Sequence, residues 1–181
     1  IAEPGMYTTV QDRGRYGYQR YGVPVSGAMD QFALRAANLL VGNAEDEAGL
    51  EAVFMGPKLE FEKDCTVAVT GADLPALVDG EEKAPWTSFT IKAGQTLSFE
   101  YLRSGARAYI AISGGIATPK QLGSRSTYPI GSLGGPVALF PFANLVPGVT
   151  HEALLEALAV GLGVAIARDL DELCAAVCRE E

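Results

Sequence analysis

The sequence has few residues of the kinds that carry metal or disulfide chemistry, with three cysteines and one histidine among 181 residues. Cys65, Cys174 and Cys178 make an odd number in a chain long enough to bury a core without disulfides, which favours reduced thiols and a cytoplasmic location. Cys174 and Cys178 lie one helical turn apart, but no histidine or further cysteine lies near them, so we expect no metal site. The single histidine, His151, is expected to be exposed and without a catalytic role.

Positive charge and long apolar runs are also scarce. Lys and Arg number 14 against 22 Asp and Glu, a formal net charge of −8, so the chain would repel a nucleic-acid backbone. No run approaches the roughly 20 apolar residues of a membrane span, because the richest stretch, residues 153–167, is broken by Glu156. The N-terminus shows no basic segment followed by an apolar one, so an export signal is not indicated. The remaining partners are a small molecule or another protein.

Familiar catalytic motifs are missing as well. The sequence contains no phosphate-binding loop that ends in Gly-Lys-Ser or Gly-Lys-Thr, no Gly-x-Ser-x-Gly turn, no paired-histidine metal motif and no dinucleotide-binding fingerprint. Any acid or base chemistry must therefore come from carboxylates, arginine, tyrosine or serine.

Glycine and proline are plentiful, at 21 and 10 residues, and they separate short apolar segments. After a first segment of strand and loop, residues 4–25, strands are predicted at residues 50–55, 58–62, 66–70, 76–78, 88–92, 96–101 and 107–113. Turn sequences such as Asp79-Gly80 separate these predicted strands. Short, evenly spaced strands close into a barrel or pack as a sandwich, and we expect a small barrel, mostly β, with one helix packed against it.

That helix is indicated after Ser26, where apolar residues change to a helical period. The residues that recur are Met29, Ala33, Ala36, Ala37, Leu40 and Val41. Ser26 or Asp30 is the expected N-cap, and Gly42 ends the helix.

A different pattern begins after Gly135, where strand and helix alternate. Strands are expected at residues 137–142 and 163–167, and helices at residues 150–159 and 169–179. Asp169 and Glu172 form a capping box for the last helix. The sequence thus predicts one domain over residues 1–135 and a divergent α/β tail over residues 136–181.

Three polar clusters are candidate sites, each with a simpler structural interpretation. Asp12 is followed by two arginines, Arg13 and Arg15, in a loop broken by Gly14, and this group can bind a carboxylate or form a surface salt bridge. Residues 26–30 lie at a helix start, which favours an anion but equally suits ordinary capping. The segment from Ser113 to Thr127 joins Gly114-Gly115 to a hydroxyl-rich loop around Arg125, which can form an anion nest or simply a turn.

Taken in order, these motifs closely resemble the biotin-dependent carboxyltransferase family that includes allophanate hydrolase subunit 2, the C subunit of 5-oxoprolinase and KipA. The segments that carry the resemblance are Pro4-Gly5, Thr8-Thr9-Val10-Gln11-Asp12-Arg13-Gly14-Arg15, Gly17-Tyr18-Gln19, Gly22-Val23-Pro24, Ser26-Gly27-Ala28-Met29-Asp30, Ala37-Asn38-Leu39-Leu40-Val41-Gly42-Asn43, Leu50-Glu51, Met55-Gly56-Pro57, Ser113-Gly114-Gly115-Ile116 and Gly123-Ser124-Arg125-Ser126-Thr127. The resemblance covers residues 1 to about 135. It implies a cyclophilin-like β architecture in a family whose members are typically much longer.

The resemblance implies three functions. The leading one is a subunit of an ATP-dependent complex that hydrolyses 5-oxoproline to glutamate, with two partners, a KipI-like protein similar to the B subunit of 5-oxoprolinase and a LamB/YcsF-type protein. ATP is then used by the assembled complex, and the isolated chain is expected to be inactive. The alternatives are the carboxyltransferase component of a biotin-dependent urea carboxylase, and a non-enzymatic KipA-like protein that binds a KipI-like kinase inhibitor.

The candidate catalytic residues are Asp12, Asp30 and Arg125. The carboxylates are candidates to position water or take a proton, and the arginine to stabilise negative charge on the substrate oxygen. The candidate substrate-binding residues are Arg13, Arg15, Ser26, Gly27, Gly114, Gly115, Ser124, Ser126 and Thr127. We expect the three arginines and the helix start at residues 26–30 to converge on one anion-binding surface.

Overall fold

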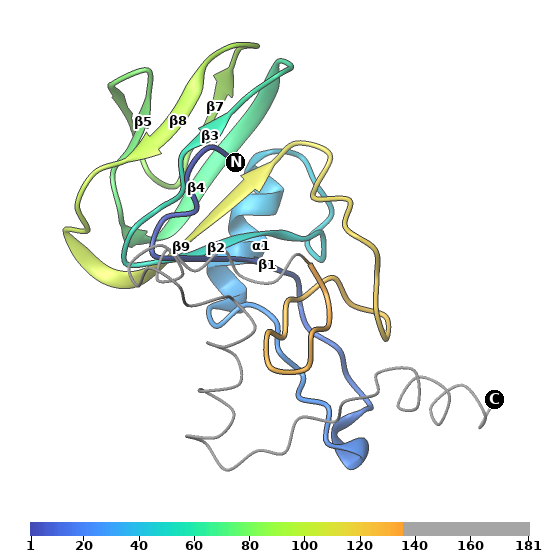
Figure 1. Cartoon of the computed structure of the whole chain (residues 1–181). Helices are drawn as coiled ribbons and strands as arrows, with labels where there is room; N and C mark the ends of the chain where they lie inside the picture. The colour runs from blue at the N-terminus through green and yellow to red at the C-terminus, as the bar shows by residue number, and fades with distance from the viewer. Residues whose placement is uncertain (136–181) are drawn as a thin grey trace, which may run out of the picture. The chain divides into compact units, whose positions relative to one another are not determined.

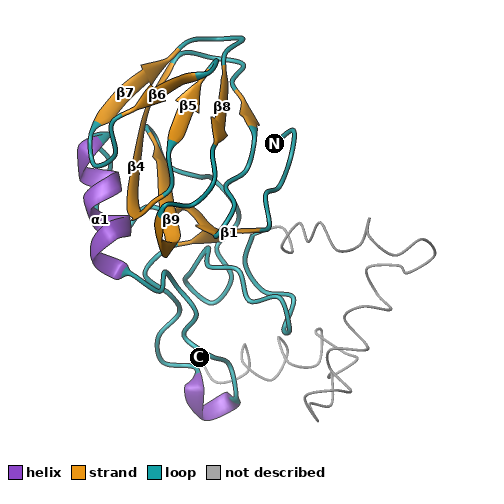
Figure 2. Cartoon of the chain, turned by 90° about the vertical axis from the view of Figure 1, so that its left-hand side faces the viewer, coloured by secondary structure: helices purple, strands orange, loops and turns teal. Residues whose placement is uncertain are grey.

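The computed structural model describes residues 1–135, which form two antiparallel sheets and one α-helix (Figures 1 and 2). The larger sheet has the strand order β1 (Tyr7–Gln11), β2 (Gly49–Val53), β9 (Ser104–Ile112), β4 (Cys65–Asp73) and β7 (Ser88–Ile91). The smaller sheet has the order β3 (Leu59–Glu60), β8 (Thr96–Phe99), β5 (Ala76–Val78) and β6 (Glu81–Lys83). A short 3-10 helix, η1 (Gln19–Tyr21), lies in the loop before the α-helix.

The main core lies on the face of the larger sheet that meets the smaller one. Val67 and Val69 of β4 are almost fully buried there, together with Ile110 of β9. Leu97 and Val78 face them from the smaller sheet. Burying one such side chain stabilises the fold by about 1.5–3 kcal/mol, so this layer holds the two sheets together.

The opposite face of the larger sheet carries helix α1 (Gln31–Leu40). Successive strand residues point to opposite faces, so Ala68 and Ala111, which alternate with the core valines and isoleucines, contact the helix instead. Their small side chains let α1 approach closely, and the Thr70 hydroxyl donates to the Ala33 carbonyl at 2.7 Å. Figure 2 shows α1 on one side of β4 and strands β5 and β8 on the other.

Local signals explain where α1 begins and ends. Asp30 is the N-cap, and its carboxylate accepts from the Ala33 amide at 2.9 Å. Gly42, with φ of 78°, follows the last turn and takes the left-handed conformation that glycine tolerates. The expected helix and the Asp30 cap are therefore present, although the segment from Ser26 to Met29 remains extended or turned rather than helical.

The segment after β9 returns to the edge of β1. The Thr127 amide donates to the Val10 carbonyl at 2.9 Å, and Tyr128 and Leu133 form an isolated bridge. Figure 1 shows this segment, in yellow and orange, beside the blue loop that follows β1. The return brings residues 124–127 onto Gln11 and Asp12.

The expected mostly-β class with one packed helix is confirmed. The strands of residues 1–135 lie in two facing sheets rather than in one closed barrel, and β1, β7, β3 and β6 are the sheet edges. Strand β6 was not predicted. Of the expected strand at residues 58–62, only Leu59–Glu60 forms a ladder with β8, while Lys58 forms an isolated bridge with Glu3 and the Phe61 amide donates to the Gln95 carbonyl at 3.1 Å. The one α-helix of this part has ten residues, too few to cross a membrane.

The chain divides into two compact units, Ile1–Phe142 and Ala143–Glu181. The strands and helices expected at residues 137–142, 150–159, 163–167 and 169–179, together with His151, Cys174 and Cys178, lie outside the described residues. The division into a domain of residues 1–135 and a tail of residues 136–181 stays a prediction.

Candidate functional site

The Asp12 carboxylate is the centre of the polar cluster that follows β1. Its Oδ1 accepts from the Gly14 amide at 2.7 Å and from the hydroxyls of Ser124 and Ser126 at 2.7 and 2.5 Å. Its Oδ2 accepts from the Arg125 amide at 2.6 Å. Burial alone would raise the pKa of Asp12, but these four hydrogen bonds outweigh it and hold the pKa below its ordinary value. The ionised carboxylate thus ties two loops together that are more than 110 residues apart.

Arg15 lies in the same cluster and is only 1% exposed. Its guanidinium donates through Nη2 to the Ser126 carbonyl, whereas Nε and Nη1 are buried without a hydrogen-bond partner in the described part of the chain. Burial lowers the pKa of Arg15, and the charge of Asp12 opposes that change. Arg15 therefore supplies positive charge beneath the loop surface.

The loop at residues 26–30 packs directly on the Asp12 loop. The Ala28 amide donates to the Asp12 carbonyl at 2.9 Å. Gly27 has φ of 87°, and a Cβ at that position would lie 2.9 Å from the backbone of Arg13 and Gly14. Only glycine fits here without strain, which explains the Ser-Gly-Ala sequence at this point. The loop before α1 and the Asp12 loop thus meet through their backbones.

Glu51 and Tyr109 hold the start of α1 on the sheet. Glu51 Oε2 accepts from the Met29 amide at 2.9 Å and from the Tyr109 hydroxyl at 2.8 Å. The Tyr109 oxygen in turn accepts from the Asp30 amide at 2.7 Å, and burial is the main cause of the raised pKa of Tyr109. A buried carboxylate therefore occupies the helix N-terminus, where an anion is favoured.

Arg125 meets Asp12 through its backbone, while its guanidinium turns elsewhere. Its Nε donates to the Thr118 carbonyl at 2.9 Å, and its Nη1 lies 3.9 Å from Glu47 Oε2. Arg125 is therefore held on the 118–125 loop and lies on the same side as Asp12, not across the sheets from it.

The Gly114-Gly115 turn does not open as an anion nest. The Gly114 amide donates to Asn43 Oδ1 at 2.8 Å, and the Gly115 amide donates to the Ile112 carbonyl at 2.9 Å. Thr127 binds Val10 and Gln11 through its backbone, and its hydroxyl has no partner within residues 1–135. The third sequence cluster thus divides: Ser124, Arg125 and Ser126 hydrogen-bond to Asp12, Thr127 binds the neighbouring strand β1, and the Gly114-Gly115 turn lies apart from both.

A cavity of about 270 Å³ opens over the Asp12 loop. It is lined by Asp12, Arg13, Gly14, Tyr16, Asp46, Lys120 and Gly123. The side chains of Arg13 and Lys120 form no ion pair or hydrogen bond within residues 1–135, whereas the Asp12 carboxylate is fully engaged by its four donors. The cavity therefore presents two available cations to a ligand in a chain whose net charge is −8.

The sequence indicated most of this cluster but not all of it. Lys120, Asp46 and Tyr16 line the cavity without having been predicted, and Glu51 and Tyr109 were also missed. Glu51 had one usable signal, because it is a lone carboxylate within the otherwise apolar strand β2. The catalytic roles of Asp12, Asp30 and Arg125 stay predictions. In residues 1–135 no group of three or more His, Cys, Asp or Glu side chains is placed to hold a metal ion.

Comparison with known proteins gives the same family at the level of sequence and of fold. The chain is 43% identical over 136 residues to urea amidolyase of Saccharomyces cerevisiae, a match that covers 75% of this chain and 7% of that protein. It is 45% identical over 129 residues to the C subunit of 5-oxoprolinase of Escherichia coli, with 70% of this chain and 41% of that protein covered. The crystal structure of Kluyveromyces lactis urea carboxylase superposes with a TM-score of 0.73 at 42% identity, over 75% of this chain and 12% of that one.

The chain thus spans less than half the length of these relatives. A family model described as the carboxyltransferase domain, subdomain A and B, matches residues 21–162. The resemblance inferred from the motifs is confirmed, and the chain belongs to the carboxyltransferase domain family.

Proposed function

We propose that this chain is part of an ATP-dependent 5-oxoprolinase and that the cavity over the Asp12 loop binds the carboxylate of 5-oxoproline. The observation that carries the proposal is the pair of available cations, Arg13 and Lys120, on two loops that the Asp12 hydrogen bonds tie together. The 45% identity to the C subunit of a 5-oxoprolinase supports the same assignment.

The chemistry of the substrate fits this charge arrangement. 5-Oxoproline carries one carboxylate and one lactam, and a guanidinium binds a carboxylate through two parallel N–H bonds whereas an ammonium acts as a point charge. With Arg13 and Lys120 on the carboxylate, the lactam would face the neighbouring subunits. Asp12 and Arg15 would position this loop rather than react.

ATP would supply the activation that a resonance-stabilised lactam needs, by making its oxygen a better leaving group. The hydroxyls of Ser124 and Ser126 and the Arg125 amide are all directed at Asp12, so this loop leaves no open cradle for a phosphate. We therefore assign ATP to the assembled complex, with a KipI-like protein and a LamB/YcsF-type protein as partners.

A second candidate, carboxyl transfer in a biotin-dependent urea carboxylase, is favoured by the 43% identity to urea amidolyase. In that case Arg13 and Lys120 would bind the carboxylate of carboxybiotin, because urea itself is neutral. The two candidates therefore use the same cavity with different anions.

The experiment is to purify the chain with its companion proteins and to measure ADP and glutamate formation with 5-oxoproline. Arg13→Ala and Lys120→Ala should each raise the KM for 5-oxoproline about tenfold, the effect of losing roughly 1.4 kcal/mol of binding. Arg103→Ala is the matched control, because Arg103 is an exposed arginine paired with Glu82 on the smaller sheet.

Two outcomes would contradict the proposal. One is carboxyl transfer from carboxybiotin to urea with no turnover of 5-oxoproline. The other is an unchanged KM in Arg13→Ala and Lys120→Ala. The chain alone, given 5-oxoproline and ATP, should show no turnover.

A further inference from the structure

The cavity over the Asp12 loop carries negative as well as positive charge. Its lining includes Asp46 together with Arg13 and Lys120. The Asp12 carboxylate is engaged by four donors, so it is not available to a ligand. Asp46, by contrast, forms no hydrogen bond or ion pair within residues 1–135, with either cation or with any other group. The cavity therefore presents one carboxylate acceptor and two cations that do not neutralise one another.

A tight turn between α1 and β2 holds Asp46 at the cavity. The Glu47 amide donates to the Ala44 carbonyl at 3.1 Å and closes the turn around Asp46. The acidic neighbours are engaged elsewhere, because Glu45 pairs with an arginine of α1 and Glu47 Oε2 lies 3.9 Å from Arg125 Nη1. Of the three acidic residues in this turn, only Asp46 lines the cavity, and only Asp46 has no partner within the described part of the chain.

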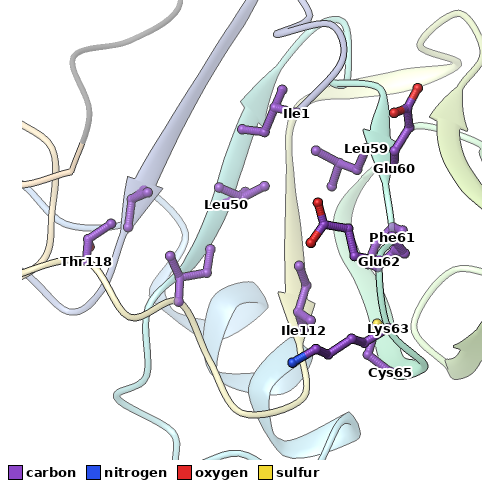
Figure 3. Close-up of a pocket in the computed structure, with 12 residues that line it drawn as sticks. Ile1, Leu50, Leu59, Glu60, Phe61, Glu62, Lys63, Cys65, Ile112 and Thr118 are labelled. Atoms are coloured by element: carbon purple, nitrogen blue, oxygen red, sulfur yellow. The ribbon is translucent and has the colours of Figure 1, made fainter. Parts of the chain in front are cut away.

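A second cavity, the groove shown in Figure 3, has a different chemistry. It has a volume of about 540 Å³ and is lined mainly by apolar residues, among them Leu50, Leu59 and Ile112. Two of its three charged lining residues, Glu60 and Glu62, are acidic, so an anion is not favoured there. The cavity over the Asp12 loop suits a small charged ligand better. At about 270 Å³ it is slightly smaller than the usual pocket for a drug-sized molecule, which fits a ligand of amino-acid size.

Unpaired charges of both signs favour a ligand that carries an anion and a hydrogen-bond donor close together. 5-Oxoproline is such a ligand, because its lactam nitrogen is attached to the carbon that bears the carboxylate. With the carboxylate on Arg13 and Lys120, the lactam N–H can donate to Asp46. A carboxylate accepts hydrogen bonds only, and its charge strengthens the bond that it receives.

Hydrolysis would increase the charge on the group beside Asp46. Water adds across the C–N bond of the ring, and that bond breaks. The water oxygen stays on the carbon, which becomes a second carboxylate, and both water protons go to the nitrogen, which becomes an ammonium. A neutral donor is thereby replaced by a cation, so the attraction to the Asp46 carboxylate increases from substrate to product.

We propose that Asp46 accepts a hydrogen bond from the lactam N–H of 5-oxoproline and pairs with the ammonium of the glutamate that is formed. Asp46 is then a specificity-determining residue, which selects acids with a nitrogen donor next to the carboxylate and holds the product in the same cavity. This inference rests on the function proposed above, because it takes the ligand carboxylate to lie on Arg13 and Lys120. The lactam carbonyl remains free for the neighbouring subunits.

Equilibrium binding tests the role of Asp46 without turnover. The full chain in complex with its companion proteins is titrated in a calorimeter, without ATP, with glutamate and with glutarate, which has the same two carboxylates but no nitrogen. Asp46→Asn should raise the Kd of glutamate about tenfold, the effect of losing one charge-assisted hydrogen bond. The Kd of glutarate should stay unchanged or fall, because the substitution removes a negative charge that repels it.

Glu45→Gln is the matched control. It removes a negative charge one residue away, from a side chain that pairs with α1 and does not line the cavity. The preference for glutamate over glutarate should therefore stay as in the unsubstituted chain. Circular dichroism checks that both variants keep the fold.

A second pair of ligands tests the contact with the substrate. In the lactone analogue of 5-oxoproline, a ring oxygen replaces the N–H. The unsubstituted chain should bind 5-oxoproline about tenfold more tightly than the lactone, because one hydrogen bond to a charged acceptor is lost. Asp46→Ala, which has no acceptor, should bind the two ligands with Kd values within about twofold of each other.

The outcomes separate this inference from the proposed function. If Arg13→Ala weakens the binding of glutamate and 5-oxoproline but Asp46→Asn leaves the preference for glutamate over glutarate unchanged, the role of Asp46 is wrong and the proposed function stands. If Glu45→Gln reduces that preference as much as Asp46→Asn does, the effect is one of general charge, and the role of Asp46 is again wrong. If the complex binds neither glutamate nor 5-oxoproline, both proposals are overturned.

Discussion

Replacing Asp12 with asparagine should destabilise the chain strongly at neutral pH. Four donors converge on the buried carboxylate, namely the amides of Gly14 and Arg125 and the hydroxyls of Ser124 and Ser126. An asparagine keeps one oxygen and turns its NH₂ group toward one of those donors. One buried donor is then unsatisfied, at a cost of about 1–3 kcal/mol, and the other three bonds lose the contribution of the charge.

The expected loss is about 4 kcal/mol in the free energy of unfolding, which combines one unsatisfied donor with three weakened bonds. For a chain of this size the loss corresponds to a decrease of about 8–16 °C in Tm. Urea titration of the full chain followed by circular dichroism measures it. Asp64→Asn is the matched control, because Asp64 accepts from the Ala93 amide and from Lys92 but is exposed, so its effect should be much smaller.

The effect should depend on pH with a defined sign. Hydrogen bonding lowers the pKa of Asp12 in the folded state, so its stabilisation is complete above the ordinary carboxyl pKa of 3.8 and is lost as the pH falls through the lower folded-state value. The difference between the Asp12→Asn chain and the unsubstituted chain should therefore be full at pH 7 and shrink below about pH 4. A difference within about 0.5 kcal/mol at pH 7 would refute the role of Asp12 as the tie between the two loops.

Two further predictions concern the loop at residues 26–30. Gly27→Ala should cost about 1–2 kcal/mol more than Gly80→Ala in urea titration, because both glycines have positive φ but only at Gly27 would the new Cβ meet backbone atoms; equal effects would contradict the close packing on Arg13. Tyr109→Phe should cost about 1–3 kcal/mol, because it leaves the Asp30 amide unsatisfied. The control for it is Tyr101→Phe, which alters a side chain that is 94% exposed, and equal stabilities of the two variants would exclude the proposed support of α1.

Local sequence determined the elements whose causes lie within a few residues. Helix α1 follows from an apolar period, from the Asp30 cap three residues before Ala33 and from the left-handed Gly42. The turn between β5 and β6 follows from Asp79-Gly80, with φ of 50° and 90°. These interactions span a few bonds, so the sequence by itself is sufficient to predict them.

The candidate site was only partly predictable, because its contacts join residues that are far apart in the sequence. The sequence marked Asp12, Arg15, Ser124 and Ser126 as polar residues in glycine-rich loops, but it could not show that the two serines donate to Asp12 rather than to a ligand. Asp12 and Ser126 are 114 residues apart, and their contact exists only because residues 113–135 return to the edge of β1. The sequence likewise could not show that the Gly114 amide donates to Asn43, 71 residues away.

The order of the strands was decided by tertiary structure alone. Thr9, Glu51, Tyr109 and Thr70 form one row across β1, β2, β9 and β4, and their register puts the Glu51 carboxylate beside the Tyr109 hydroxyl beneath the start of α1. A strand's alternation tells which residues share a face but not which strand lies beside it. The sequence therefore determined the helix, the turns and the mostly-β class, whereas the packing of the two sheets decided which loops meet at Asp12.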